Sequence, residues 1–162
     1  MLDKRVMKDL IAIVLRGGAD FVEVFCEYTK NNVIAYSNKK IESVSDRAVS
    51  GVGIRAFVGT NTFFASTTDM TPAGLKECAN RVAQVVGNPV SVAKDFYLTE
   101  QINKNINPVR INPFDVPSSA RAEIVKRACA TAYAYDPKII QVSGNLVLQD
   151  KSFVVANSEG LY

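Results

Sequence analysis

The sequence predicts an α+β fold in which helices pack on one face of a mostly antiparallel β-sheet. Three observations support this: strand-like alternation fills most of residues 20–67, two helical patterns follow from Thr71 onward, and strand-like residues return after Pro137. Strands grouped in one block with helices after them are typical of α+β domains. With 162 residues, 48% of them apolar, the chain is large enough for one hydrophobic core, so we expect a single domain over residues 1–162.

The first elements are a helix and a strand. Apolar residues recur at helical spacing over residues 3–15, and Gly17 and Gly18 end that helix. Asp9 interrupts the apolar run and no small-residue cleavage site follows, so we expect neither a signal peptide nor a membrane span. Residues 20–28 then alternate as a half-buried strand. The side chains expected to point inward are Val22, Val24, Cys26 and Tyr28.

Three further strand segments follow. Asn31 and Asn32 are expected to form a tight turn into a strand over residues 33–37, because Asn tolerates left-handed backbone geometry. Residues 41–46 form the next strand. Residues 48–58 and 62–67 then read as an extended hairpin around turn residues 59–61, with the even side chains of its first strand buried. Those even side chains include Val52, Ile54 and Val58.

Two helices and a strand pair complete the chain. Thr71 is expected to cap a helix whose first residue is Pro72 and which stops at residues 87–89. Residues 88–117 form a long connection, with a short extended piece at 96–98, that either packs over the surface, as we expect, or serves a contact. The second helix is expected to start at a Ser118 or Ser119 cap and to end at Asp136-Pro137, followed by a β pair over residues 139–148 and 151–156.

The candidate contact residues lie in the hairpin and are Gly51, Gly53 and Arg55. The two glycines leave one strand face bare, as expected where a bulge forms or where another backbone or a large side chain lies close. Gly51, Gly53 and Ala56 formally match a dinucleotide fingerprint, but the residues after Gly53 continue as strand where that motif needs a helix. Arg55 either contacts a peptide or a partner domain through its guanidinium, or pairs with an acidic residue on a neighbouring strand, which we favour.

Composition excludes most catalytic arrangements in this chain. There is no histidine, so Ser66 has no base of the Ser-His-Asp kind, and Asp69 is expected to be a turn or capping residue. The three cysteines match no zinc-ligand spacing and are expected to be buried free thiols, which suits a reducing cytoplasm. The net charge of +3 comes without a basic cluster, so we expect no nucleic-acid partner. We predict no catalytic, cofactor-binding or metal-binding residue, and no activity for this chain alone.

The succession of short motifs resembles the N-terminal region of the TldD/PmbA family, also called modulators of DNA gyrase. The motifs keep the family's order over essentially the whole chain, and the form of the hairpin at Ile54-Arg55 favours the TldD-like branch. Phe63 departs from the family pattern, which usually has Gly there. The matching segments are residues 18–24 (GADFVEV), 40–44 (KIESV), 51–55 (GVGIR), 63–67 (FFAST), 69–72 (DMTP) and 157–160 (NSEG).

The resemblance implies that the chain is an N-terminal domain of a longer protein, truncated before the metal-binding region. TldD-like members resemble zinc metallopeptidases, whose zinc ligands lie beyond the part that this chain resembles. The implied role is a noncatalytic domain that helps to enclose a peptide and to form subunit contacts. The implied partners are the C-terminal region of the same protein, a family member in a homo- or heterodimer, and a peptide substrate. The alternative is a protein- or DNA-interaction module of a gyrase modulator without peptidase activity.

Overall fold

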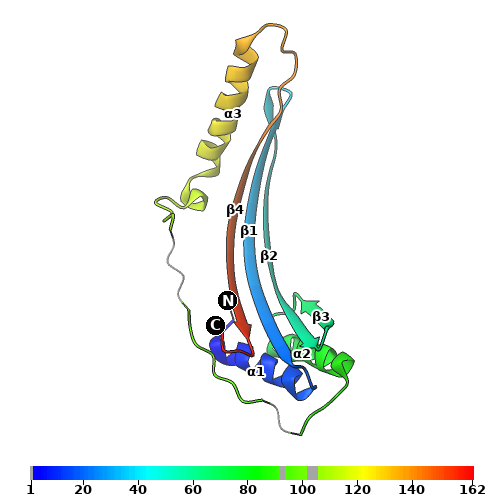
Figure 1. Cartoon of the computed structure of the whole chain (residues 1–162). Coiled ribbons are helices and arrows are strands. Elements are labelled where there is room, and N and C mark those ends of the chain that lie inside the picture. The colour runs from blue at the N-terminus through cyan, green and yellow to red at the C-terminus, as the bar shows by residue number, and fades with distance from the viewer. Residues whose placement is uncertain (1, 92–93, 102–105) are drawn as a thin grey trace. The chain divides into compact units, whose positions relative to one another are not determined.

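The structure is a computed structural model that describes residues 2–91, 94–101 and 106–162. Its strands form one four-stranded antiparallel sheet in the order β3-β2-β1-β4 (Figure 1), which confirms the predicted α+β class. The elements follow along the chain as α1 (Lys4–Arg16), β1 (Phe21–Ser37), β2 (Lys40–Val58), β3 (Asn61–Thr67), α2 (Pro72–Val86), the 3-10 turn η1 (Pro113–Asp115), α3 (Ser118–Tyr135) and β4 (Gly144–Asn157).

The chain separates into two compact units, each with a hydrophobic core of its own. The strands β1, β2 and β4 contribute residues to both units. Unit 1 comprises Met1–Tyr28, Val49–Asn103 and Lys151–Tyr162, and unit 2 comprises Thr29–Ala48 and Lys104–Asp150.

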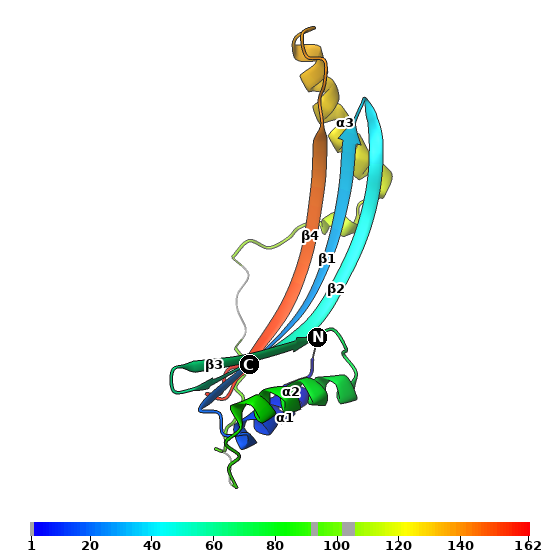
Figure 2. The same ribbon diagram turned by 90° about the vertical axis from the view of Figure 1, so that its right-hand side faces the viewer.

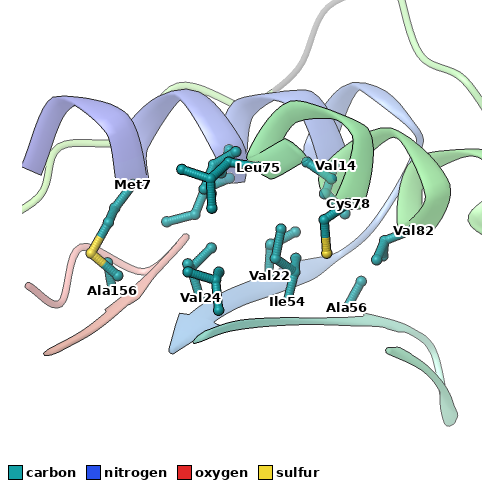
Figure 3. Close-up of a cluster of buried hydrophobic side chains, with 14 of the residues drawn as sticks. Met7, Val14, Val22, Val24, Ile54, Ala56, Leu75, Cys78, Val82 and Ala156 are labelled. Atoms are coloured by element: carbon teal, nitrogen blue, oxygen red, sulfur yellow. The ribbon is translucent and has the colours of Figure 1, made fainter. Parts of the chain in front are cut away.

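The core of unit 1 lies between two helices and one face of the sheet. Figure 2 shows α1 and α2 lying together on the same side of the strands. Helix side chains such as Leu75 and Val82 of α2 lie over Val22, Ile54 and Ala56 of the strands (Figure 3). All five are at most 2% exposed, so the predicted inward residues of β1 and β2 supply the apolar surface that the helices bury. Two expected inward residues differ: Val58 is only partly buried and Tyr28 is 43% exposed.

The ends of α1 and α2 have local chemical causes. Asp3 caps α1 by accepting a hydrogen bond from the Arg5 amide at 2.7 Å. Thr71 caps α2 by accepting from the Gly74 amide at 3.1 Å, and Pro72 is the first helical residue, as predicted. Gly87 ends α2 with a φ of 69°, the left-handed conformation that favours glycine.

Asp69 supports the start of α2 from the preceding turn. Its carboxylate accepts a hydrogen bond from the Thr71 amide at 2.9 Å, and hydrogen bonding by Thr71 holds the pKa of Asp69 below its ordinary value of 3.8. This confirms the turn and capping role expected from the sequence.

We expect this carboxylate to make the stability of the protein depend on acid pH. Because its pKa is lower in the folded state, its contribution is complete above the ordinary value of 3.8 and is lost as the pH falls through the folded pKa. Urea unfolding of the wild type and Asp69→Asn should therefore differ at pH about 6, and the difference should shrink as the pH falls below 3.8 and through the folded pKa. A difference that stays constant over this range would contradict the assignment.

The strands are longer and fewer than the sequence suggested. Asn31 and Asn32 do not form a turn: β1 continues through them to Ser37, and Asn32 is fully buried. The turn to β2 is instead at Asn38 and Lys39, whose φ angles of 49° and 62° fit a two-residue hairpin loop. The expected strands 41–46 and 48–58 are parts of the single strand β2. The expected pair 139–148 and 151–156 is replaced by the single strand β4, which begins only at Gly144, so residues 139–143 are not strand. Alternating segments can merge without a turn where cross-strand pairing continues.

Unit 2 buries one side of α3. Val125 and Cys129 of this helix form a core with Ile34 and Tyr36 of β1. The expected serine cap is wrong, because α3 begins after Pro117 and no side chain caps it. Ser118 is instead the first helical residue, and its hydroxyl accepts a hydrogen bond from Arg121.

The connection after α2 packs on unit 1 where the structure describes it. Phe96 and Leu98 are each 7% exposed and belong to the unit 1 core, as expected for a segment that packs over the surface. Thr99 continues the extended piece and pairs with Leu161 in an isolated parallel bridge. The three cysteines are buried and free, as predicted.

Candidate functional site

The three sequence-predicted contact residues lie together on unit 1. Gly51, Gly53 and Arg55 line one open groove of about 870 Å³ on the face of the sheet opposite α1 and α2. The other lining residues belong to β1, β2 and β3, except Thr68, which directly follows β3. They are Glu23, Phe25, Glu27, Val49, Ser50, Val52, Phe64, Ser66, Thr67 and Thr68.

The glycines make room for an aromatic side chain from the next strand. In the β2–β3 register Gly53 is opposite Ser66 and Arg55 is opposite Phe64. A Cβ atom on Gly53 would lie 3.1 Å from Cε2 of Phe64, and a Cβ atom on Gly51 would lie 3.2 Å from the carbonyl oxygen of Thr67. The bare face predicted from the sequence is therefore a place of close approach, as expected for glycines in a strand.

Arg55 makes the local pair that the sequence analysis favoured. Its Nη2 lies 2.6 Å from Oε1 of Glu23 on the neighbouring strand β1, and its guanidinium lies 5.6 Å from the ring centre of Phe57. The Arg55 side chain is 49% exposed and that of Glu23 is 25% exposed. The pair therefore orients Arg55 while about half of its side chain stays exposed. Exposed ion pairs of this kind contribute about 1 kcal/mol or less to the free energy of unfolding.

A second set of contacts continues the same face toward β4. Lys151 pairs with Glu27 at 2.6 Å, and the rings of Phe25 and Phe153 stack with centres 5.8 Å apart. Phe64 and Phe153 are 66% and 57% exposed. The face thus combines exposed aromatic rings with two ion pairs of balanced charge.

Sequence reasoning did not single out these aromatic residues. Phe64 follows Phe63 in the sequence, and only the alternation of β3 separates them: Phe63 packs against the unit 1 core, whereas Phe64 lies in the groove. The same alternation would have placed Phe64 on the face of Arg55. The departure from the family pattern at Phe63 therefore affects the core side of the sheet.

The described residues contain no cluster of potential metal ligands. Within residues 2–91, 94–101 and 106–162, no three His, Cys, Asp or Glu side chains lie close enough together to hold a metal ion. Burial raises the pKa of the Cys78 thiol, which disfavours the nucleophilic thiolate form. A zinc centre therefore does not fit the side chains of this part of the chain, and the groove offers contact and recognition chemistry.

Comparisons with known proteins extend these observations. The chain resembles three solved structures: a proposed modulator of DNA gyrase from Bacteroides thetaiotaomicron (TM-score 0.71, 15% identity), TldE from Thermococcus kodakarensis (0.65, 17%) and a proposed modulator of a DNA gyrase from Thermotoga maritima (0.66, 16%). The similarity covers 96%, 96% and 98% of this chain but only 36%, 35% and 36% of the three solved chains. The chain thus spans about a third of their length. At such low identity the likeness shows the fold.

The family assignment comes from the sequence of β1, β2, β3 and α2. No curated protein matches the chain. Among the described residues, no helix combines the length and the apolar character needed to span a bilayer. Residues 22–86 match the PmbA/TldA metallopeptidase domain 1. This match contains the groove residues from Glu23 to Thr68, and it shows that this part of the chain is similar to the first domain of the PmbA/TldD family.

Proposed function

We propose that this chain is the noncatalytic first domain of a PmbA/TldD-like zinc metallopeptidase, and that its groove forms part of the wall around the peptide substrate. The groove on unit 1 is the observation that supports this role. It lies on the face not used by α1 and α2, and it contains apolar rings, hydroxyl groups and one ion pair. Peptide-binding surfaces combine apolar contact with a few polar groups that orient the ligand.

The position of β3 adds to this argument. β3 is an edge strand of the sheet, and Phe64, Ser66 and Thr67 of this strand line the groove. An extended peptide can pair with an edge strand through main-chain hydrogen bonds while its side chains occupy neighbouring pockets. We infer that a peptide beside β3 would place alternate side chains against Phe64 and the glycine face.

The zinc ion belongs, in this proposal, to a later part of the longer protein. The described residues offer no ligand set for it, so this chain's contribution is to bind and orient. The further partners are the C-terminal region of the same protein and a second family member in a homo- or heterodimer. The buried free cysteines are compatible with the cytoplasmic location that we propose.

The test uses the full-length gene product and the variant Phe64→Ala. Loss of the exposed ring should raise KM for peptide hydrolysis about fivefold while kcat stays within about twofold, because an aromatic contact of about 1 kcal/mol would be removed from binding. Tyr97→Ala is the matched control, since Tyr97 is 76% exposed, belongs to unit 1 and does not line the groove.

Three results would count against the proposal. An unchanged KM in Phe64→Ala would remove the groove from the peptide site. A gene product that ends at Tyr162, or peptide hydrolysis by the 162-residue chain alone, would overturn the role of a noncatalytic domain. Binding to a gyrase subunit or to DNA without peptide hydrolysis by the full-length protein would support the interaction-module alternative instead.

A further inference from the structure

The charged side chains of the groove on unit 1 neutralise one another. Those that line it are Glu23, Glu27 and Arg55, which taken alone would give the groove an excess of negative charge. Arg55 pairs with Glu23 at 2.6 Å, and Lys151, which lies outside the lining, pairs with Glu27 at 2.6 Å. Each carboxylate thus has a cation of its own, and the groove presents no net charge to a ligand.

The rest of the groove combines apolar rings with neutral hydroxyl groups. Phe64 on β3 and Phe25 on β1 contribute rings to the lining, and Phe25 stacks on Phe153 of β4 with ring centres 5.8 Å apart. Phe64 and Phe153 are more than half exposed, so they offer apolar surface that a ligand can bury. Ser66 and Thr67 add hydroxyl groups, which can bond to the main chain of a peptide.

The bare strand face leaves space beside these rings. A Cβ atom added to Gly51 would meet the carbonyl oxygen of Thr67 at 3.2 Å and the methyl carbon of Thr68 at 3.9 Å. Among the described residues, no ring and no charged group lies within 4 Å of that position. The groove volume of about 870 Å³ is within the range of ligand-binding pockets. A large apolar side chain of a bound peptide can therefore lie over Gly51.

A charged peptide side chain is at a disadvantage in the same place. A peptide that covers the groove removes water from the Arg55–Glu23 pair, and such a pair stays favourable only while its partners keep each other. A peptide carboxylate reaches Arg55 only by competing with Glu23, and a peptide ammonium group reaches Glu23 only by competing with Arg55. Either way one charge is left buried without a partner, which is costly.

We propose that the groove selects uncharged, apolar segments of extended peptide, and that the Arg55–Glu23 pair excludes charged side chains from it. This inference rests on the proposed role of the groove as part of the wall around the peptide. Alternate side chains of an extended peptide point to the same side. Apolar residues separated by one position therefore lie against Phe64 and in the space over Gly51.

The test measures the binding of short fluorescent peptides to the 162-residue chain by anisotropy. The peptides consist of Gly and Ser, except for two positions separated by one residue, which are both Leu, both Asp or both Lys. The Leu peptide should bind about tenfold more tightly than either charged peptide, because it leaves no charge unpaired. Its Kd should change by less than about twofold between about 50 mM and about 500 mM sodium chloride, because the groove is neutral.

The decisive variant is Glu23→Gln, which keeps the shape of the side chain and leaves the charge of Arg55 uncompensated. The Asp peptide should bind this variant about fivefold more tightly than the wild type, and added salt should weaken that binding. The Leu peptide should change by less than about twofold. Glu77→Gln is the matched control, because it removes the same charge from an ion pair with Arg81 on α2, outside the groove. It should bind all three peptides as the wild type does.

The possible contrary results separate this selectivity from the role of the groove. Equal affinities of the wild type for the three peptides, or no gain of the Asp peptide in Glu23→Gln, would overturn the selectivity and leave the peptide wall in place. Binding of no peptide would also overturn it, and the KM of Phe64→Ala in the full-length protein would then decide the role of the groove separately. Dimerisation of the chain that Phe64→Ala abolishes would assign this face to a second copy instead.

Discussion

Replacing Gly18 by alanine is expected to lower the free energy of unfolding by about 3 kcal/mol, as the sum of a left-handed backbone penalty and a steric clash. Gly18 has a φ of 94°, and a Cβ atom there would lie 1.9 Å from the carbonyl oxygen of Asn88. The neighbouring backbone cannot move freely, because the Asn88 amide donates to the Gly17 carbonyl at 3.1 Å and the Val90 amide donates to the Arg16 carbonyl at 3.0 Å. The clash therefore opens the contact between the ends of α1 and α2.

Gly59→Ala is the matched control for this prediction. Gly59 also has a positive φ, of 55°, but nothing lies within 4 Å of the added Cβ atom. Its substitution should cost about 1 kcal/mol, the backbone penalty alone. Urea unfolding of both variants measures the difference. Equal losses in the two variants would show that the Asn88 contact has no role beyond backbone strain.

Truncation of Ile54 to alanine is expected to lower the free energy of unfolding by about 3–4 kcal/mol, through lost apolar transfer energy and an unfilled cavity. Ile54 is fully buried in β2, and Figure 3 shows it among the strand side chains that face α2. The backbone around it is fixed by pairing with Ala65 of β3. The site cannot collapse easily around the missing atoms, because sheet pairing holds both strands in place.

Ile124→Ala removes the same atoms at an exposed position. Ile124 lies on α3 and is 56% exposed, so little buried surface is lost and alanine is the better helix former. This variant should unfold within about 0.5 kcal/mol of the wild type. Chemical denaturation followed by circular dichroism compares the two. A loss in Ile54→Ala no larger than in Ile124→Ala would contradict the position assigned to the unit 1 core.

Local signals predicted the elements whose ends depend on neighbouring residues. Thr71 and Pro72 predicted the start of α2, and Gly87 predicted its end, because capping acts over three or four residues. The alternation at Val52 and Ile54 predicted the buried face of β2. These predictions needed no knowledge of what the helices or strands pack against.

The long strands could not be predicted in the same way. Asn32 is typical of a turn, yet it lies inside β1, where its side chain is held by distant residues. Its Nδ2 donates to the carbonyl oxygen of Ser45 and to Oδ1 of Asp46 on β2, and its Oδ1 accepts from Nη1 of Arg121. Arg121 is 89 residues away in the sequence. The turn preference of an asparagine is a local property, and hydrogen bonds from distant residues override it here.

The candidate site shows the same division. The sequence singled out Gly51, Gly53 and Arg55, because bare glycines and a charged residue on one strand face indicate a close approach or a contact. The ion pair with Glu23 and the position of Phe64 over Gly53 depend on which strands are neighbours and in what register. A shift of one residue in that register would move Phe64 to the other face.

By itself, the sequence determined the α+β class, the start and end of α2, the buried face of β2 and the resemblance to the PmbA/TldD family. Only the tertiary structure decided that β1, β2 and β4 are continuous strands, that aromatic rings gather beside the glycine face, and that Arg121 is buried at an uncapped helix end. The physical reason is the range of the interactions. Caps and side-chain alternation act over a few residues, whereas strand pairing and the burial of a charge depend on contacts between segments far apart in the chain.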